Sequence, residues 1–230
     1  EGKNIPNLRQ PLAVYAQQNE LDYAELIERL DKSKKRLWEA RKKRIPPLCD
    51  DKVITAWNGM MIKTFAYVGQ QLNRADYIEC AGKAANYVLE KNKLESSELA
   101  RSSLEGKASI PALQEDYAYF AEALLQLYDA TSETAWLNHA AKLTDKMIKL
   151  FWDEDQGGFF MGEQAGTGLL PSIPKEINDN ATASGNSVAL RTLARLARRV
   201  GEQRYAQYAQ YLIRAYSDDI TQRPYICAYL

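Results

Sequence analysis

Residues 50–60 read DDKVITAWNGM, and the rest of the chain is organised around this stretch. Two carboxylates and a lysine precede Thr55, a residue type that caps helices, and an apolar run follows. The stretch therefore predicts a helix with polar groups gathered at its N-terminus, where an anion or another ligand can bind. Alternatively, Asp50 and Asp51 complement the helix dipole and Trp57 belongs to the core.

From this helix onward, the sequence repeats a helix–turn–helix unit three times. The aromatic residues Tyr77, Trp136 and Tyr205 mark equivalent positions, 59 and 69 residues apart. Each is followed four residues later by an alanine, and each comes after a short polar break. A small residue at this place lets two helix backbones approach closely. Units of this kind cannot bury their apolar faces alone, so they stack side by side.

The repeat predicts an all-α fold of stacked αα-hairpins. The first helices of the three units are expected over residues 55–72, 114–131 and 183–200. The second helices are expected over residues 75–91, 133–151 and 203–217. Alternation of β-branched and aromatic residues is scarce, which argues against a sheet-based fold. Short extended segments are expected near Leu99 to Leu104 and near Gly157 to Gly162.

A leading segment precedes the repeats. Residues 1–19 contain Pro6 and Pro11 and are expected to form a loop. Residues 22–43 predict a helix that ends in a basic run. This run is either a phosphate-binding face or, as we favour, a solvated face.

The composition excludes several classes of function. The 230 residues include 30 basic and 30 acidic side chains, so no excess of positive charge favours nucleic acid binding. No apolar run is long enough to span a membrane, and the first residues do not resemble a signal peptide. The chain begins with Glu1, which indicates a piece of a longer protein. Three cysteines without CxxC spacing argue against a disulfide framework and a zinc site, and favour a reducing, cytoplasmic location. We expect no metal and no cofactor.

Polar side chains gather at the same place in every unit, in the loop that leads into its first helix. If the hairpins stack in a ring, these three loops converge at one end, where long loops handle ligands. The residues concerned are Asp51, Trp57 and Asn58 in the first unit, Glu115, Asp116 and Tyr117 in the second, and Asp179, Ser184 and Asn186 in the third.

The acidic residues of these loops are the candidate catalytic groups. Asp51 and Asp116 are assigned as acid/base carboxylates, with Glu115 as their partner. Alternatively, Glu115 and Asp116 are acids in the first turn of a helix that only complement its dipole.

The other residues of these loops are candidate substrate-binding groups. Trp57 and Tyr117 are expected to be stacking surfaces, although Tyr117 is also a common core residue. Asn58, Asp179 and Asn186 are assigned as hydrogen-bonding residues.

The loop into the third unit has its own alternatives. Residues 178–180 can form a plain turn. Ser184 is assigned as a substrate-binding residue, and alternatively it is a plain N-cap. Gly185 permits close approach of a backbone or a ligand. His139 is the only histidine and is expected on the surface or in a groove, so no histidine pair can act within this chain.

Four motifs resemble a known family. They are DDKVITAWNG at residues 50–59, EDYA at 115–118, FWDE with GGFF within 151–160, and NATASGNS at 180–187. Together they look like the C-terminal, six-hairpin glycosidase-like region of the thioredoxin-domain-containing, spermatogenesis-associated protein family. The resemblance covers nearly the whole chain. Two positions depart from the family pattern, since Ala183 stands where a proline is usual and Asn180 where a glycine is usual.

The resemblance implies that residues 1–230 are part of an (α/α) six-hairpin toroid, without the thioredoxin-like domain. Its expected parts are residues 1–50, a helix and loops; residues 51–97, hairpin one; residues 98–155, hairpin two; and residues 156–230, an extended loop and hairpin three. Three hairpins cannot close a ring of six. An apolar edge is therefore expected to be exposed or to form a homodimer.

Two functions remain open at this point. The first is a carbohydrate-binding or carbohydrate-processing domain, with glycoside hydrolase-like chemistry, because such toroids resemble glycoside hydrolases and sugar epimerases in fold. Sugar epimerases rely on paired histidines, and this chain has a single histidine, so epimerase chemistry of that kind is not expected. The alternative is a non-enzymatic scaffold that presents clients to an attached thioredoxin-like domain. If Asp116 is catalytic, Asp116→Asn abolishes sugar binding or turnover; if it is a cap, the change lowers stability.

Overall fold

The structure is a computed structural model that describes residues 7–163 and 173–229. The chain divides into two units, Glu1–Asp50 and Asp51–Leu230, and each is described by itself.

In the first unit, residues 7–50 include the helices α1 (Leu12–Gln18) and α2 (Tyr23–Lys42). Helix α2 agrees with the prediction, and the side chain of Asp22 caps it by accepting a hydrogen bond from the Glu25 N–H at 2.8 Å. Helix α1 corrects the expectation of a loop over the first 19 residues. Pro11 lies at the start of α1. Proline is tolerated at a helix start, because the first backbone N–H groups of a helix have no partner within it and a missing one costs no hydrogen bond.

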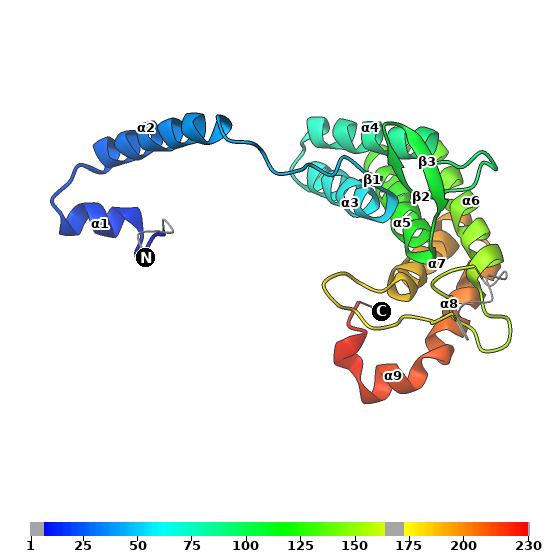
Figure 1. Cartoon of the computed structure of the whole chain (residues 1–230). Coiled ribbons are helices and arrows are strands. Elements are labelled where there is room, and N and C mark those ends of the chain that lie inside the picture. Colours follow the sequence, from blue (N-terminus) through cyan, green and yellow to red (C-terminus); the bar gives the residue numbers. More distant parts are fainter. Residues whose placement is uncertain (1–6, 164–172, 230) are drawn as a thin grey trace. The chain divides into compact units, whose positions relative to one another are not determined.

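Three helical hairpins make up most of the described part of the second unit, which confirms the all-α fold of stacked αα-hairpins (Figure 1). Helices α3, α5 and α7 pack side by side, and each also packs against the second helix of its own hairpin. The hairpins are α3 (Thr55–Gln71) with α4 (Ala75–Lys91), α5 (Gln114–Thr131) with α6 (Thr134–Phe151), and α7 (Gly185–Val200) with α8 (Gln203–Ala215).

Helix α5 is the centre of the core because α3 and α7 pack on its two sides and α6 covers a third. Its side chains are buried in an almost unbroken run from Gln114 to Leu127. The alanines that recur in the second helices are buried as well, with at most 7% exposure, as close helix packing requires. They are Ala81, Ala140 and Ala209.

A small antiparallel sheet fixes the chain just before α3. Its strands are β1 (Val53–Ile54), β2 (Ala100–Leu104) and β3 (Lys107–Pro111), in the order β1-β2-β3. Only β2 lies where an extended segment was predicted. Pairing with β2 keeps the chain extended as far as Ile54, so Thr55 is the first helical residue and not the cap. Its hydroxyl instead donates a hydrogen bond to the Ala100 carbonyl at 2.6 Å.

The last part of the chain returns to the start of α7. It consists of α9 (Ser217–Gln222) and a short 3-10 turn, η1 (Pro224–Ile226). The Asp179 N–H donates to the Ile226 carbonyl at 2.6 Å, and the Tyr229 N–H donates to the Asp179 carboxylate at 2.7 Å. These bonds hold the terminal segment against the loop that precedes α7.

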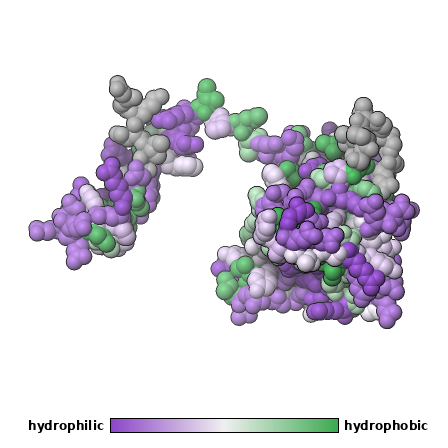
Figure 2. All heavy atoms as spheres, turned by 90° about the horizontal axis from the view of Figure 1, so that it is seen from below, coloured by the Kyte–Doolittle hydropathy of each residue, from purple (hydrophilic) through white to green (hydrophobic). Residues whose placement is uncertain are grey.

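Helix α3 carries exposed apolar side chains on the side away from the core. Trp57 is 63% exposed, and Met61 and Tyr67 are each 53% exposed. The face shown in Figure 2 is mainly polar with scattered apolar spots. Within residues 7–163 and 173–229, no helix is both long enough and apolar enough to cross a membrane.

Candidate functional site

A cavity of about 200 Å³ lies where α5 and α7 begin, and we call it the helix-start cavity. Two carboxylates, those of Glu115 and Glu176, line it. Amide, hydroxyl and other groups complete the wall, from residues Leu113, Gln114, Met161, Asn178, Asn180, Thr182, Ala183, Ser184 and Gly185. Of the nine residues predicted from the sequence, Glu115 and Ser184 line this cavity.

Asp116 is a structural link and not an accessible acid. Its side chain is fully buried, and its two oxygens accept hydrogen bonds from the Ala56 N–H at 3.1 Å and the Leu113 N–H at 2.9 Å. Arg101 from β2 lies 3.2 Å away. Burial raises the pKa of this carboxyl to about 6, against the lowering effect of these donors. The acid/base role predicted for Asp116 therefore has no accessible oxygen in this structure.

Glu115, next to Asp116, remains accessible. Its side chain is 37% exposed and accepts a hydrogen bond from the Arg101 guanidinium at 3.0 Å. One arginine thus holds two adjacent carboxylates, but only Glu115 faces the cavity. The predicted partnership of the two acids is structural, with Arg101 between them.

Tyr117 is a core residue in the structure, with 2% exposure. Its ring packs against Phe151, with 5.6 Å between ring centroids, and burial raises the pKa of its hydroxyl to about 12. Neither face of the ring is open to a sugar, so the predicted stacking surface is absent at this residue.

Asp179 and Ser184 organise the start of α7. Ser184 is its N-cap, since its hydroxyl accepts a hydrogen bond from the Ser187 N–H at 3.1 Å, as expected for a plain cap. One oxygen of Asp179 accepts from the Ser184 N–H at 2.8 Å and from the Ser187 hydroxyl at 2.9 Å. The other oxygen holds Tyr229. Asp179 is thus committed to bonds within the fold.

Asn186 and Gly185 join α7 to its neighbours. The Asn186 side chain, 1% exposed, accepts from the Phe159 N–H at 2.8 Å and donates to the carbonyls of Phe159 and Glu176 at 3.0 and 2.8 Å. The Gly185 carbonyl accepts a hydrogen bond from Gln114 at 3.0 Å. A side chain at Gly185 would meet Gln114, so this glycine serves close helix packing. Asn186 was predicted to bind substrate, but in the structure its side chain is engaged in hydrogen bonds within the protein.

The three residues predicted in the first hairpin do not line the helix-start cavity. Asp51 is exposed, and Trp57 is largely exposed on α3. Asn58 is half-buried and donates from its side chain to the Ile54 carbonyl at 2.9 Å. Residues of the second and third hairpins therefore share this cavity, whereas the residues predicted in the first hairpin lie outside it, although Asp116 ties the starts of α3 and α5 together.

Sequence reasoning missed a charged cluster on facing sides of α3, α5 and α7, which we call the inner-helix cluster. The buried Glu122 accepts a hydrogen bond from Lys63 at 2.8 Å and lies 3.3 Å from Arg191. Two helical turns further along α5, Asp129 pairs with Arg195 and Arg199. The available signal was a charged residue inside the apolar run of residues 117–127, with polar residues at the i+4 and i+7 positions.

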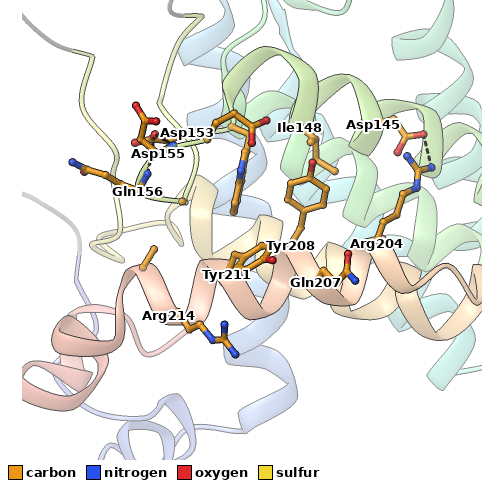
Figure 3. A pocket seen from close by; sticks show the side chains of 14 residues that line it. Asp145, Ile148, Asp153, Asp155, Gln156, Arg204, Gln207, Tyr208, Tyr211 and Arg214 are labelled. Atoms are coloured by element: carbon orange, nitrogen blue, oxygen red, sulfur yellow. Dashed lines mark hydrogen bonds and ion pairs between the residues drawn. The ribbon is translucent and has the colours of Figure 1, made fainter.

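A larger groove, about 750 Å³, lies between α6 and α8 (Figure 3). Tyr208 and Tyr211 of α8 line it, and Tyr211 is 53% exposed. Asp145 of α6 pairs with Arg204 of α8 at 3.1 Å, which closes one end. We call it the outer groove. None of the nine predicted residues lines it.

The beginning of the loop after α6 is braced next to this groove. Asp153 accepts hydrogen bonds from Lys175 at 2.7 Å and from the N–H groups of Asp155 and Gln156 at 2.9 and 3.1 Å. The hydrogen bond from Lys175 holds the pKa of this carboxyl below its usual range. His139 is exposed, as expected. Among the described residues, no group of His, Cys, Asp and Glu side chains is suited to hold a metal ion.

Comparison with known proteins confirms the resemblance seen in the sequence. The chain is homologous to part of human spermatogenesis-associated protein 20, with 33% identity over 97% of the chain. It spans about 30% of the length of that protein. No protein-family model matches the chain.

Solved structures confirm the fold. A cellobiose 2-epimerase from Spirochaeta thermophila matches with a TM-score of 0.59 and 18% identity, over 72% of this chain and 43% of the epimerase. A family-76 α-mannanase from Bacteroides thetaiotaomicron matches with a TM-score of 0.59 and 12% identity, over 75% of this chain and 45% of the mannanase. The second unit thus has the six-hairpin, glycosidase-like α/α toroid fold, in part.

Proposed function

We propose that the second unit binds carbohydrate in the helix-start cavity and is the carbohydrate-binding or carbohydrate-processing domain of a longer protein. The observation that carries the proposal is the lining of this cavity: two carboxylates with several amide and hydroxyl groups. Groups of this kind bind sugar hydroxyls. The proposal is supported by the fold, which is shared with enzymes named for the sugars cellobiose and mannan.

The size of the cavity limits its ligand. About 200 Å³ is smaller than the roughly 300–1,000 Å³ of typical ligand pockets. The cavity therefore suits one sugar ring, with any further rings outside it. Trp57 remains a proposed stacking surface for a sugar ring, because its side chain is exposed on α3.

Glu115 and Glu176 are the proposed acid/base pair. Glycoside chemistry needs two carboxylates near the scissile bond, and both of these residues line one cavity. Asp116 then acts as a positioning residue, since it shares Arg101 with Glu115 and fixes the start of α5. Asp51 remains a proposed further carboxylate on the exposed surface before α3.

Ligand-observed NMR with a panel of mono- and disaccharides tests this proposal. Glu115→Gln is expected to weaken sugar binding while the melting temperature stays nearly unchanged. Glu154→Gln is the matched control, because Glu154 is an exposed acid that lines the outer groove. Binding lost in Glu154→Gln but kept in Glu115→Gln would refute the helix-start cavity as the site. If neither this chain nor a full-length relative binds any sugar of the panel, the proposed function is refuted.

A non-enzymatic scaffold is the second candidate. It is supported by the polar atoms of Asp116 and Asn186, which are all engaged in bonds within the fold. In this proposal, the unit presents clients to a thioredoxin-like domain in a longer, cytoplasmic protein. Client capture by the longer protein that is lost when residues 51–230 are deleted, without any sugar binding, is the result expected for a scaffold.

A further inference from the structure

The inner-helix cluster carries more positive than negative charge. Its four basic residues face two carboxylates, an excess of two positive charges among the described residues. The six residues are Lys63 on α3, Glu122 and Asp129 on α5, and Arg191, Arg195 and Arg199 on α7.

One end of the cluster is saturated. Asp129 accepts hydrogen bonds from Arg199 at 2.8 and 2.6 Å, in a two-pronged contact, and from Arg195 at 2.8 Å. Arg195 also donates to Gln126 at 3.1 Å. With these contacts, both oxygens of Asp129 are occupied, and this end is a helix-to-helix tie.

The other end has unused bonding capacity on both the acidic and the basic side. Glu122 is fully buried, and its Oε1 atom has no hydrogen-bond donor among the described residues. Arg191 reaches this oxygen only through Nε, at 3.3 Å. The described contacts leave its two terminal nitrogens without a hydrogen-bond partner, and its side chain is 40% exposed. A buried polar atom left in this way is costly unless something satisfies it.

Tyr229 lies over this open end. Its hydroxyl accepts a hydrogen bond from Lys63 at 2.5 Å, and its ring lies 4.3 Å from the Arg191 guanidinium. Its backbone N–H also donates a hydrogen bond to the Asp179 carboxylate at 2.7 Å. A ring that carries a hydroxyl therefore already occupies the position above Lys63, Glu122 and Arg191.

We propose that Lys63, Glu122 and Arg191 bind an acidic sugar, one that carries a carboxylate or a phosphate, and that this ligand displaces Tyr229. The anionic group accepts hydrogen bonds from the Arg191 terminal nitrogens and from Lys63. A sugar hydroxyl donates to the Oε1 atom of Glu122. Both halves of the ligand contribute, because an ionised carboxylate or phosphate monoester has no hydrogen to donate to the Glu122 oxygen, and a neutral sugar leaves the excess positive charge unpaired. This inference rests on the proposed function, to which it adds the acidic substituent.

The test compares the binding of four probes by NMR: glucose, glucuronate, glucose 6-phosphate and inorganic phosphate. We expect an acidic sugar to bind more tightly than glucose and than inorganic phosphate, with an affinity that falls as salt is added. Glucuronate and glucose 6-phosphate distinguish a carboxylate from a phosphate ligand. Equal binding of inorganic phosphate and glucose 6-phosphate would overturn the part assigned to the sugar hydroxyl.

Two substitutions on α7 give the matched comparison. Arg191→Gln is expected to weaken binding of the acidic sugar roughly tenfold or more, the worth of a hydrogen bond to a charged group. Arg198→Gln, which changes an exposed arginine about two turns further along the helix, is expected to leave it unchanged. Equal losses in both variants, or no loss in Arg191→Gln, would overturn the site.

Tyr229→Ala guards against a loss caused by misfolding. It removes the side chain that covers the cluster, so we expect the acidic sugar to bind at least as tightly as in the unchanged chain. Weaker binding would contradict the displacement of Tyr229. If sugars bind at the helix-start cavity without preference for the acidic ones, the proposed function stands and this inference falls. If none of the four probes binds, this inference falls, and the wider sugar panel on this chain and a full-length relative decides the proposed function.

Discussion

The Asp116 carboxylate accepts a hydrogen bond from the Ala56 N–H at 3.1 Å, across 60 residues of sequence. This bond satisfies a donor in the first turn of α3 with an acid in the first turn of α5, so one side chain caps two helices. The Leu113 N–H binds the second oxygen of the same carboxylate. The first turns of two neighbouring inner helices are therefore fixed to each other.

We predict that Asp116→Asn lowers the free energy of unfolding by about 1–3 kcal/mol at pH 7, because the amide supplies a donor where an acceptor is needed. Urea denaturation measures the loss. Asp155→Asn, which changes an exposed acid, is expected to stay within about 0.5 kcal/mol of the unchanged chain. Equal stability of the two variants would mean that Asp116 does not hold the helix starts.

The effect of Asp116→Asn is expected to depend on pH. The pKa of Asp116 is about 6 in the fold and ordinarily 3.8, so between these values the folded chain holds a proton that the unfolded chain has released. The contribution of Asp116 to stability therefore falls as the pH rises from about 4 to about 6. The cost of Asp116→Asn should be larger at pH 4 than at pH 7, by up to about 3 kcal/mol.

Urea denaturation of the unchanged chain and the Asp116→Asn variant at both pH values measures this difference, and carboxyl NMR locates the titration midpoint. A cost that grows toward pH 7 would show that the fold favours the ionised carboxylate.

We predict that Gly185→Ala destabilises the fold by roughly 1–3 kcal/mol. A methyl group there would lie 1.9 Å from the Gln114 side-chain oxygen and 3.3 Å from the Glu115 backbone. Gln114 would have to move and give up its bond to the Gly185 carbonyl. Gly82→Ala is the control, because the nearest neighbour of the new methyl group would be Trp136 at 3.9 Å. Alanine has the better helix propensity, so this substitution should leave the stability unchanged or raise it. Thermal unfolding of both variants decides between packing and propensity.

Asn186→Ala is expected to cost roughly 2–4 kcal/mol, because it removes three hydrogen bonds and leaves buried backbone groups unsatisfied. Asn138→Ala, on the exposed side of α6, should change stability little. Hydrogen exchange at the Phe159 amide gives a local reading, since this N–H loses its acceptor in the first variant. Unchanged protection there would contradict the assigned role of Asn186.

The exposed apolar side of α3 predicts self-association, as proposed for an open toroid edge. Trp57→Lys is expected to weaken dimer formation in analytical ultracentrifugation, because it places a charge among exposed apolar side chains. Trp38→Lys changes a tryptophan of similar exposure in the first unit and serves as the control. A monomer at all concentrations, or an equal effect of both substitutions, would rule out this edge as the contact.

The helical hairpins could be predicted from the sequence because their signals are local. The spacing of Tyr77, Trp136 and Tyr205 placed three hairpins to within a few residues, and Ser184 was correctly predicted as a possible cap. Apolar periodicity, helix breakers and caps act over one or two turns, so neighbouring residues contain them. Strand β3 and helix α1 were missed because their signals are short.

The use of each polar residue was decided by the tertiary structure. Asp116 and Asn186 were predicted to meet a ligand, but Ala56, 60 residues away, and Phe159, 27 residues away, supply their partners. The inner-helix cluster joins residues on three helices, so no short stretch of sequence contains it. The sequence by itself determined the repeated hairpins and the place where polar groups gather. Only the packing of the hairpins decided which groups bind each other and which stay accessible, because hydrogen bonds depend on distance in space.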